Sequence, residues 1–154
     1  MHKLAGFVVS ENSSHHRSVP CYEENFLKEV ESVYAEDLLL YDTSTFYVSK
    51  FNKKIMGSVK TTLWDELTVL PIEKRFNIPC KELSFFNDDL LIWHIGGLAI
   101  SKSNNPYGLK LLMQLLILAI YGICRHPNSI MVAEFDKKLL RWLNRMGIKT
   151  EALA

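Results

Sequence analysis

Apolar and polar positions follow two different periods along the chain, and these periods predict both helices and strands. In residues 22–40, apolar side chains recur every three or four positions, as they do on one face of a helix. Residues 45–51 and 55–63 are instead rich in β-branched and aromatic residues. The short polar run 52–54 separates them, so the sequence predicts a β-hairpin.

Other apolar segments are interpreted as strands. Residues 4–10 are apolar and β-rich, which predicts a first strand, followed by a polar loop over 12–17. Residues 90–100 are apolar almost throughout, as expected for a central strand that is buried on both faces. Residues 129–134 form a shorter run of the same kind, and residues 150–153 are expected to begin one last strand.

Further helices are predicted from their ends and from their apolar content. Pro71 opens a short helix over 71–76, because proline is tolerated at the first helical position. The Leu-rich run 109–123 predicts a helix packed inside the fold, since it falls short of the roughly 18 to 20 apolar residues that a membrane span needs. Asp136 is expected to cap a last helix, and Gly147 to end it in the left-handed conformation.

Length and composition indicate one globular α/β domain that covers residues 1–154. The 154 residues are 48% apolar and 23% charged, which is ordinary globular composition. The formal net charge of +1 gives no electrostatic reason to expect binding to nucleic acid or to an anionic membrane. Three cysteines without C-x-x-C spacing, and no signal-peptide pattern, indicate a reducing compartment, so a cytoplasmic location is expected.

The segment from the central strand to the following helix carries the strongest candidate for a binding site. Gly96 and Gly97 interrupt the strand, and glycine inside a strand often marks a bulge or the close approach of a ligand. The run Asn105-Pro106-Tyr107-Gly108 then opens the helix, whose free N–H groups and positive dipole end suit a pyrophosphate. The alternative is an ordinary strand-to-helix loop without a ligand.

On these residues and on the order of its elements, the sequence resembles the GNAT acyltransferase superfamily. Within it, the nearest branch is that of acyl-homoserine-lactone synthases and N-acyl amino acid synthases. The resemblance covers roughly residues 46–147: a hairpin over 46–63, a proline-bearing segment over 70–76, and a strand over 93–100 that reads WHIGGLAI. The family strand has the form W-E-x-S-R-F-A-V, of which the tryptophan and the apolar end are kept.

The resemblance implies a mixed, mostly antiparallel sheet flanked by helices, in which the 93–100 strand splays from its neighbour at a bulge. The pantetheine arm of an acyl thioester would enter at the splay, and its pyrophosphate would rest on the next helix start. His94 falls where the family has its glutamate, Gly97 where it has its arginine, and Lys60 where the hairpin carries an arginine. The chain ends near Leu153, where the family fold continues, so the sheet is expected to be abbreviated or completed by a partner, unless the sequence is a fragment.

A GNAT-like protein would transfer an acyl group from acyl-CoA, or from an acyl carrier protein thioester, to a small amine. The reaction needs a base for the amine proton and a donor for the oxyanion. His94 is the first candidate base, because imidazole titrates near neutral pH. The structural alternative is a hydrogen-bonded histidine in the core beside Trp93. Glu134 and Glu82 are the other candidate bases.

The same resemblance implies a thioester site and its partners. The residues implied for this site are Leu98, Ile100, Lys102, Asn105, Tyr107, Gly108 and Leu109. No metal is expected, since no carboxylate or cysteine lies at ligand spacing from His15 and His16. The expected partners are a small acyl donor and an amine acceptor, without nucleic acid or membrane, and a homodimer is left open.

A function of another class stays open at this point. The family glutamate, arginine and loop glycines that this chain lacks favour a catalytically inactive GNAT-fold module, which binds an acyl ligand or another protein. An enzyme should present His94 or a carboxylate to the cleft, whereas a module needs no base there.

Overall fold

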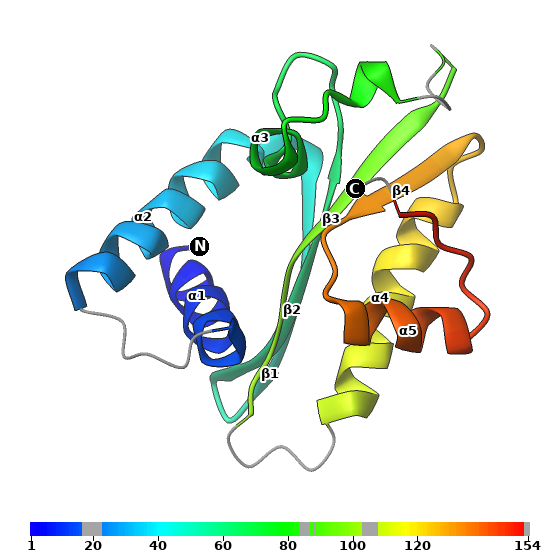
Figure 1. Ribbon diagram of the computed structural model, residues 1–154. Helices are drawn as coiled ribbons and strands as arrows, with labels where there is room; N and C mark the ends of the chain where they lie inside the picture. The colour runs from blue at the N-terminus through cyan, green and yellow to red at the C-terminus, as the bar shows by residue number, and fades with distance from the viewer. Residues whose placement is uncertain (17–22, 84–86, 88, 103–107, 153–154) are drawn as a thin grey trace.

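The computed structural model describes residues 1–16, 23–83, 87, 89–102 and 108–152. These residues form a four-stranded sheet between helices (Figure 1). In chain order the elements are α1 (His2–His16), α2 (Glu23–Leu39), η1 (Tyr41–Thr43), β1 (Ser44–Phe51), β2 (Lys54–Leu63), α3 (Pro71–Phe76), η2 (Cys80–Glu82), β3 (Leu91–Ile100), α4 (Gly108–Cys124), β4 (Ser129–Ala133) and α5 (Lys137–Arg145).

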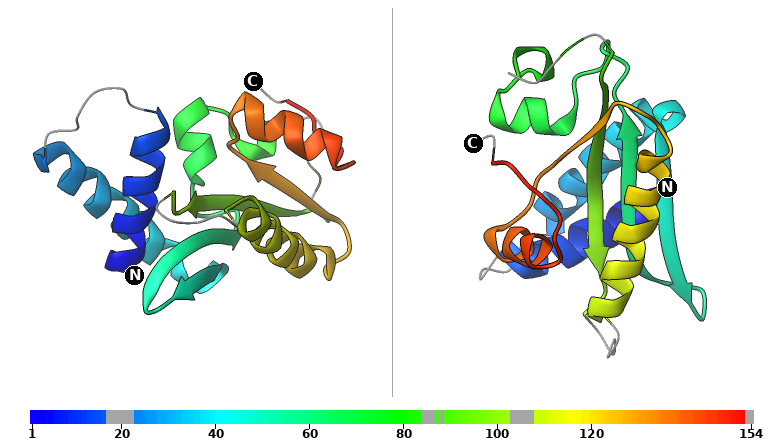
Figure 2. Two further views of the ribbon diagram at one scale, coloured as in Figure 1. Left: turned by 90° about the horizontal axis from the view of Figure 1, so that it is seen from below. Right: turned by 90° about the vertical axis from the view of Figure 1, so that its right-hand side faces the viewer.

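The strands lie in the order β1-β2-β3-β4. β1 pairs antiparallel with β2, and β2 with β3, whereas β3 and β4 run parallel. α1 and α2 cover one face of the sheet, and α4 covers the other (Figure 1). In Figure 2 (right), where the right-hand side of Figure 1 faces the viewer, α4 runs in front of the strands. α5 lies beyond β4, on the side away from β1. The prediction of a mixed, mostly antiparallel sheet flanked by helices is confirmed.

The N-terminal segment contradicts the sequence prediction, because it is a helix. Residues 4–10, predicted as a first strand, and residues 12–16, predicted as a polar loop, belong to α1, and the last loop residue lies outside the described part. Ala5 and Val9, four positions apart, pack against Val30 of α2. The neighbouring residues Leu4 and Val8 pack against Ala99 of β3. A helix buries both pairs of residues at once, and this outweighs the low helix propensity of adjacent valines.

The hairpin between β1 and β2 lies where the sequence predicts it. Asn52 and Lys53 form a two-residue turn with positive φ values of 47° and 65°. A type I′ turn requires positive φ at both central positions, and its twist matches that of the strands. Lys54, which the sequence prediction assigned to the turn, is the first residue of β2.

The predicted helices after the hairpin are present, but the prediction that the Leu-rich helix is packed on both sides is wrong, because Ile117, Leu118 and Tyr121 on its outer face are exposed. α3 begins at Pro71, and α4 covers the Leu-rich run. Asp136 caps α5, because its carboxylate accepts the N–H groups of Lys138 and Leu139 at 2.9 and 2.7 Å. Gly147 follows this helix with a φ of 83°, the left-handed conformation that was expected there.

The C-terminal residues contradict the last prediction for the fold. Residues 150–152 form no strand, and the residue after them lies outside the described part. The N–H of Ile148 donates to the carbonyl of Leu143 at 3.2 Å. The Thr150 hydroxyl donates to the Asn144 side chain at 2.6 Å. These bonds hold the segment against the end of α5 instead of at an edge of the sheet.

The main core lies between α4 and the sheet. Leu115, Ala119 and Ile123 of α4 form one buried cluster with Val59 of β2 and Ile95 of β3. A second cluster joins the start of α3 to β3 and β4. In the part of the chain that the structure describes, no helix is both long and apolar enough to cross a membrane.

Truncation of Ile123 tests whether the inner face of α4 supports the fold. The side chain of Ile123 is 1% exposed, so we expect Ile123→Ala to lower the free energy of unfolding by about 2–5 kcal/mol in urea denaturation. Ile117 lies on the outer face of the same helix and is 61% exposed. The matched variant Ile117→Ala should therefore lower the free energy of unfolding by less than about 0.5 kcal/mol. Equal losses in the two variants would contradict this arrangement of α4.

Candidate active site

β3 and β4 are paired along only half of β3. Their parallel ladder begins at Leu91 and Ser129 and ends at Ile95 and Ala133. β4 stops there, whereas β3 continues to Ile100 (Figure 1). The second half of β3 therefore has no strand on the β4 side among the described residues, and the sheet opens at this point.

A β-bulge lies where the sheet opens. Gly97 and Leu98 of β3 together face the single residue Val59 of β2, so β3 carries one extra residue. Gly97 has a φ of +58°, a conformation that side chains with a Cβ rarely adopt. Because of the extra residue, Trp93 before the bulge and Leu98 after it both pack toward α4. The prediction that the glycine pair marks a bulge is confirmed.

His94 is buried beside this opening, on the face of β3 away from α4. It is 3% exposed, and its Nδ1 is buried without a hydrogen-bond partner among the described residues. The imidazole leans over Gly96, since a Cβ on that glycine would lie only 2.9 Å from Cε1 of the ring. Burial, together with the charges of Lys60 and Arg75, lowers the pKa of His94 to about 4. The structural alternative of a core histidine is right about burial, whereas the Nδ1 atom lacks the hydrogen bond that this alternative would give it.

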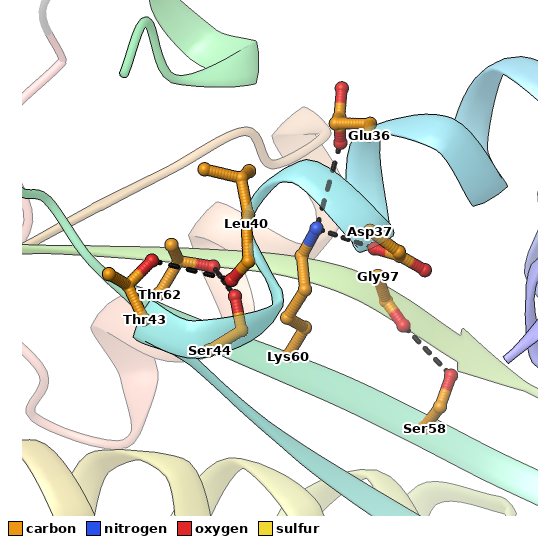
Figure 3. Close-up of polar contacts among 9 residues, drawn as sticks. All are labelled: Glu36, Asp37, Leu40, Thr43, Ser44, Ser58, Lys60, Thr62 and Gly97. Atoms are coloured by element: carbon orange, nitrogen blue, oxygen red, sulfur yellow. Dashed lines mark hydrogen bonds and ion pairs between the residues drawn. The ribbon is translucent and has the colours of Figure 1, made fainter. Parts of the chain in front are cut away.

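A buried ion pair lies on the same face of the sheet. The Nζ of Lys60, on β2, is 2.7 Å from the carboxylate of Asp37 and 3.6 Å from that of Glu36, both near the end of α2 (Figure 3). The Lys60 side chain is 5% exposed. From the sequence, Lys60 is expected only as a substitute for the family arginine, and neither of its ion-pair partners is predicted. Asp37 was nevertheless detectable, because it falls on the apolar stripe of α2, four positions after Val33.

A second ion pair lies at the other end of the site. Arg75 of α3 donates to the carboxylate of Glu134, which directly follows β4. Burial raises the pKa of Glu134, and the charge of Arg75 opposes that rise. Arg75 also acts on His94, and Glu36 acts on Glu134. We therefore treat six residues as one polar cluster: Glu36, Asp37, Lys60, Arg75, His94 and Glu134.

The structure brings together only some of the residues that the sequence suggested. His94 and Glu134 belong to the polar cluster, whereas Glu82 is exposed in η2, outside it. Leu98 and Ile100 lie on β3 beyond the last β3–β4 pair, and their side chains pack against the core under α4.

The predicted pyrophosphate site is described only at its two sides. Lys102 is exposed after the end of β3, and its N–H donates to the Glu11 carboxylate at 3.3 Å. Gly108 is the first described residue of α4, and Leu109 is exposed. Asn105 and Tyr107 lie outside the described residues, in the segment 103–107. Their predicted roles therefore stay predictions.

An apolar groove of about 550 Å³ lies on the other face of the sheet, between β1 and α4. Tyr47, Leu111 and Leu118 are among its lining residues. β1 is two strands away from β3, so this groove is separate from the opening beside the polar cluster.

Removal of the Lys60 charge tests the buried ion pair. We expect Lys60→Met to lower the free energy of unfolding by about 3–5 kcal/mol, because Asp37 would stay buried without its partner. The double variant Lys60→Met with Asp37→Leu should recover most of this loss in urea denaturation. If the double variant is no more stable than the single one, an unpaired Asp37 is not the cause of the loss.

The lowered pKa of His94 predicts a pH dependence of stability. The pKa is about 4 in the folded chain, against an ordinary value of 6.5 that applies to the unfolded chain. The unfolded chain therefore binds a proton in this window while the folded chain does not, and the free energy of unfolding falls as the pH falls. Between pH 7 and pH 5 we expect the wild type to lose about 2 kcal/mol more than His94→Gln. Parallel curves for the two proteins in urea denaturation would rule out a buried neutral histidine.

Comparison with solved structures places this geometry in a known fold. A predicted acetyltransferase from Clostridium acetobutylicum, solved with acetyl-CoA, aligns with a TM-score of 0.63 at 10% identity, over 99% of this chain and 86% of its own. A GCN5-related N-acetyltransferase from Ralstonia eutropha aligns with a TM-score of 0.62 at 10% identity, over 99% and 90%. A transcriptional regulator from Bacillus halodurans aligns with a TM-score of 0.61 at 16% identity, over 100% and 93%. No protein-family model matches the sequence, and no curated protein does. The chain therefore has the fold of the GNAT acetyltransferases, as the sequence resemblance predicted.

Proposed function

We propose that this chain is an acyl-CoA-dependent N-acyltransferase, which binds its acyl thioester between β3 and the segment that follows β4. One coincidence carries the proposal: the last β3–β4 pair at Ile95, the bulge at Gly97 and the buried imidazole of His94 lie in one short stretch of β3. A sheet that opens leaves backbone N–H and C=O groups without a strand partner. An extended pantetheine arm can bond to such groups as a strand does.

The proposed reaction is direct transfer to an amine. The amine nitrogen attacks the thioester carbonyl carbon, its proton passes to His94, and the C–S bond breaks. The proton then passes from His94 to the leaving sulfur, so the products are an amide and free CoA thiol. With a pKa of about 4, the imidazole is neutral at pH 7, which is the form that can accept a proton.

The backbone around the bulge supplies the other half of the proposed site. The N–H of Leu98 is the proposed donor to the oxyanion, and the N–H of Ile100 a proposed donor to the pantetheine arm. Lys102, Gly108 and Leu109 flank the proposed pyrophosphate site at the start of α4. The acceptor amine would approach from the opposite side, over the polar cluster, because His94 faces that side.

Several finer points belong to the same proposal. An acyl carrier protein would present the same pantetheine arm as CoA, so it is a second donor to test. The preference for an amino-acid-like acceptor rests on the sequence resemblance to acyl-homoserine-lactone and N-acyl amino acid synthases. A cytoplasmic location and a homodimer stay predictions in the same way.

One observation favours a second function, an acyl-binding module without catalysis. Two carboxylates of the polar cluster are already engaged, the buried Asp37 by Lys60 and the partly buried Glu134 by Arg75. A histidine with a pKa of about 4 is also a weak base. Such a module would keep the thioester opening and lack turnover.

Thermal melting with acetyl-CoA and with palmitoyl-CoA tests the thioester site first. A ligand at about 100 times its Kd stabilises the fold by about 2.7 kcal/mol, which corresponds to roughly 5–10 °C in Tm for a chain of this size. Free CoA is the control for the acyl group. A chain that melts at the same temperature with and without every one of these ligands would speak against both functions.

Release of free thiol from acetyl-CoA then separates the enzyme from the module. With glycine, homoserine lactone and spermidine as probe amines, we expect His94→Gln to lower the rate about 100- to 10,000-fold and to keep the shift in Tm. Glu134→Gln is the matched variant, and we expect it to lower the rate less. A shift in Tm without thiol release from any of the three amines would favour the module.

A further inference from the structure

Ser58 of β2 holds the peptide at the centre of the bulge. Ser58 is buried, and its hydroxyl donates a hydrogen bond of 2.8 Å to the carbonyl of Gly97 (Figure 3). The extra residue of a bulge is left out of the ladder, so its carbonyl needs a partner from elsewhere. Ser58 supplies that partner from the neighbouring strand.

This hydrogen bond also determines where the next amide points. The C=O of Gly97 and the N–H of Leu98 belong to one planar trans peptide, so they point in opposite directions. Since the carbonyl is directed at Ser58, the Leu98 N–H is directed away from β2. On that side of β3, the pairing with β4 has already ended at Ile95. The amide therefore faces the opening of the sheet.

We propose that Ser58 is a positioning residue for acyl transfer. By fixing the Gly97–Leu98 peptide, it aims the Leu98 N–H at the carbonyl oxygen of a bound acyl thioester. This inference rests on the proposed function, because it requires a thioester in the opening. Ser58 itself contacts no reacting atom and acts only through the peptide that it holds.

Lys60 and Ser58 are two side chains that contact the bulge on this face of the sheet. A Cβ added to Gly97 would lie 3.5 Å from the Cβ of Lys60, so the bulge backbone rests against a side chain that Asp37 holds in place. The bulge backbone therefore contacts Lys60 on this face, and the Ser58 hydroxyl bonds to its carbonyl. Loss of the hydroxyl would free the peptide to rotate without removing the bulge.

Infrared difference spectroscopy tests this role without the natural acceptor. Acetyl-CoA labelled with ¹³C at the thioester carbonyl is bound to the wild type and to Ser58→Ala. In the wild type we expect the carbonyl stretch to lie below its value in free acetyl-CoA, because the Leu98 N–H bonds to the oxygen. In Ser58→Ala most of this lowering should be lost. With a probe amine that the wild type acylates, kcat should fall about 10- to 100-fold, with KM for acetyl-CoA changed less than about threefold.

Other variants separate positioning from a loss of stability. Ser44→Ala removes a comparable bond, the 2.8 Å contact between the Ser44 and Thr62 hydroxyls (Figure 3), and should leave the carbonyl frequency unchanged. Ser58→Thr keeps the hydroxyl and should keep the full lowering. Ser58→Cys has a weaker donor and should give an intermediate value. The Thr and Cys variants decide the question if Ser58→Ala does not fold.

The outcomes distinguish this inference from the proposed function. If the carbonyl frequency in Ser58→Ala equals that of the wild type, the positioning role is wrong and the thioester site stands. If acetyl-CoA binds to the wild type without any lowering, the Leu98 amide is not the donor, and this inference again fails alone. If acetyl-CoA does not bind to the wild type, the proposed function and this inference fail together.

Discussion

β3 has one more residue than β2 between the two ends of their pairing, and a regular ladder has no place for it. The extra residue falls at Gly97, where a left-handed backbone meets no Cβ penalty. Side chains on the α4 face are odd-numbered before the bulge, as at Trp93, and even-numbered after it, as at Leu98. One apolar layer thus stays continuous under α4, while the extra residue lies just beyond the last β3–β4 pair.

The opposite face of the sheet carries charges that a protein interior normally avoids. Pairing explains how the fold tolerates the buried charge of Lys60, which is in contact with Asp37. A buried pair of this kind contributes little net stability, but it is costly to break, so it fixes the end of α2 on β2. The pair between Arg75 and Glu134 is different, because the Arg75 side chain is 68% exposed and an exposed pair is only weakly stabilising. His94 lies in the field of both cations, and this field helps burial to keep it neutral.

Most of the fold could be predicted from the sequence, because the hairpin, β3 and α4 have strong local patterns and clear ends. The helix α1 could not be predicted in this way. Its buried side chains pack partly against α2 and partly against β3, and residues 4–10 alone do not reveal either partner. At the site, the glycine pair predicted the bulge, but the role of Ser58 depends on a register that only the paired strands define. The pairing of Arg75 with Glu134 joins residues 59 positions apart, which no local pattern connects.

The close approach of the His94 ring to Gly96 links two residues of β3 that look independent in the sequence. Any Cβ at position 96 would collide with the imidazole in its present rotamer. The ring at position 94 thus occupies the volume that a side chain at position 96 would need on the same face. In related chains the two positions should therefore vary together.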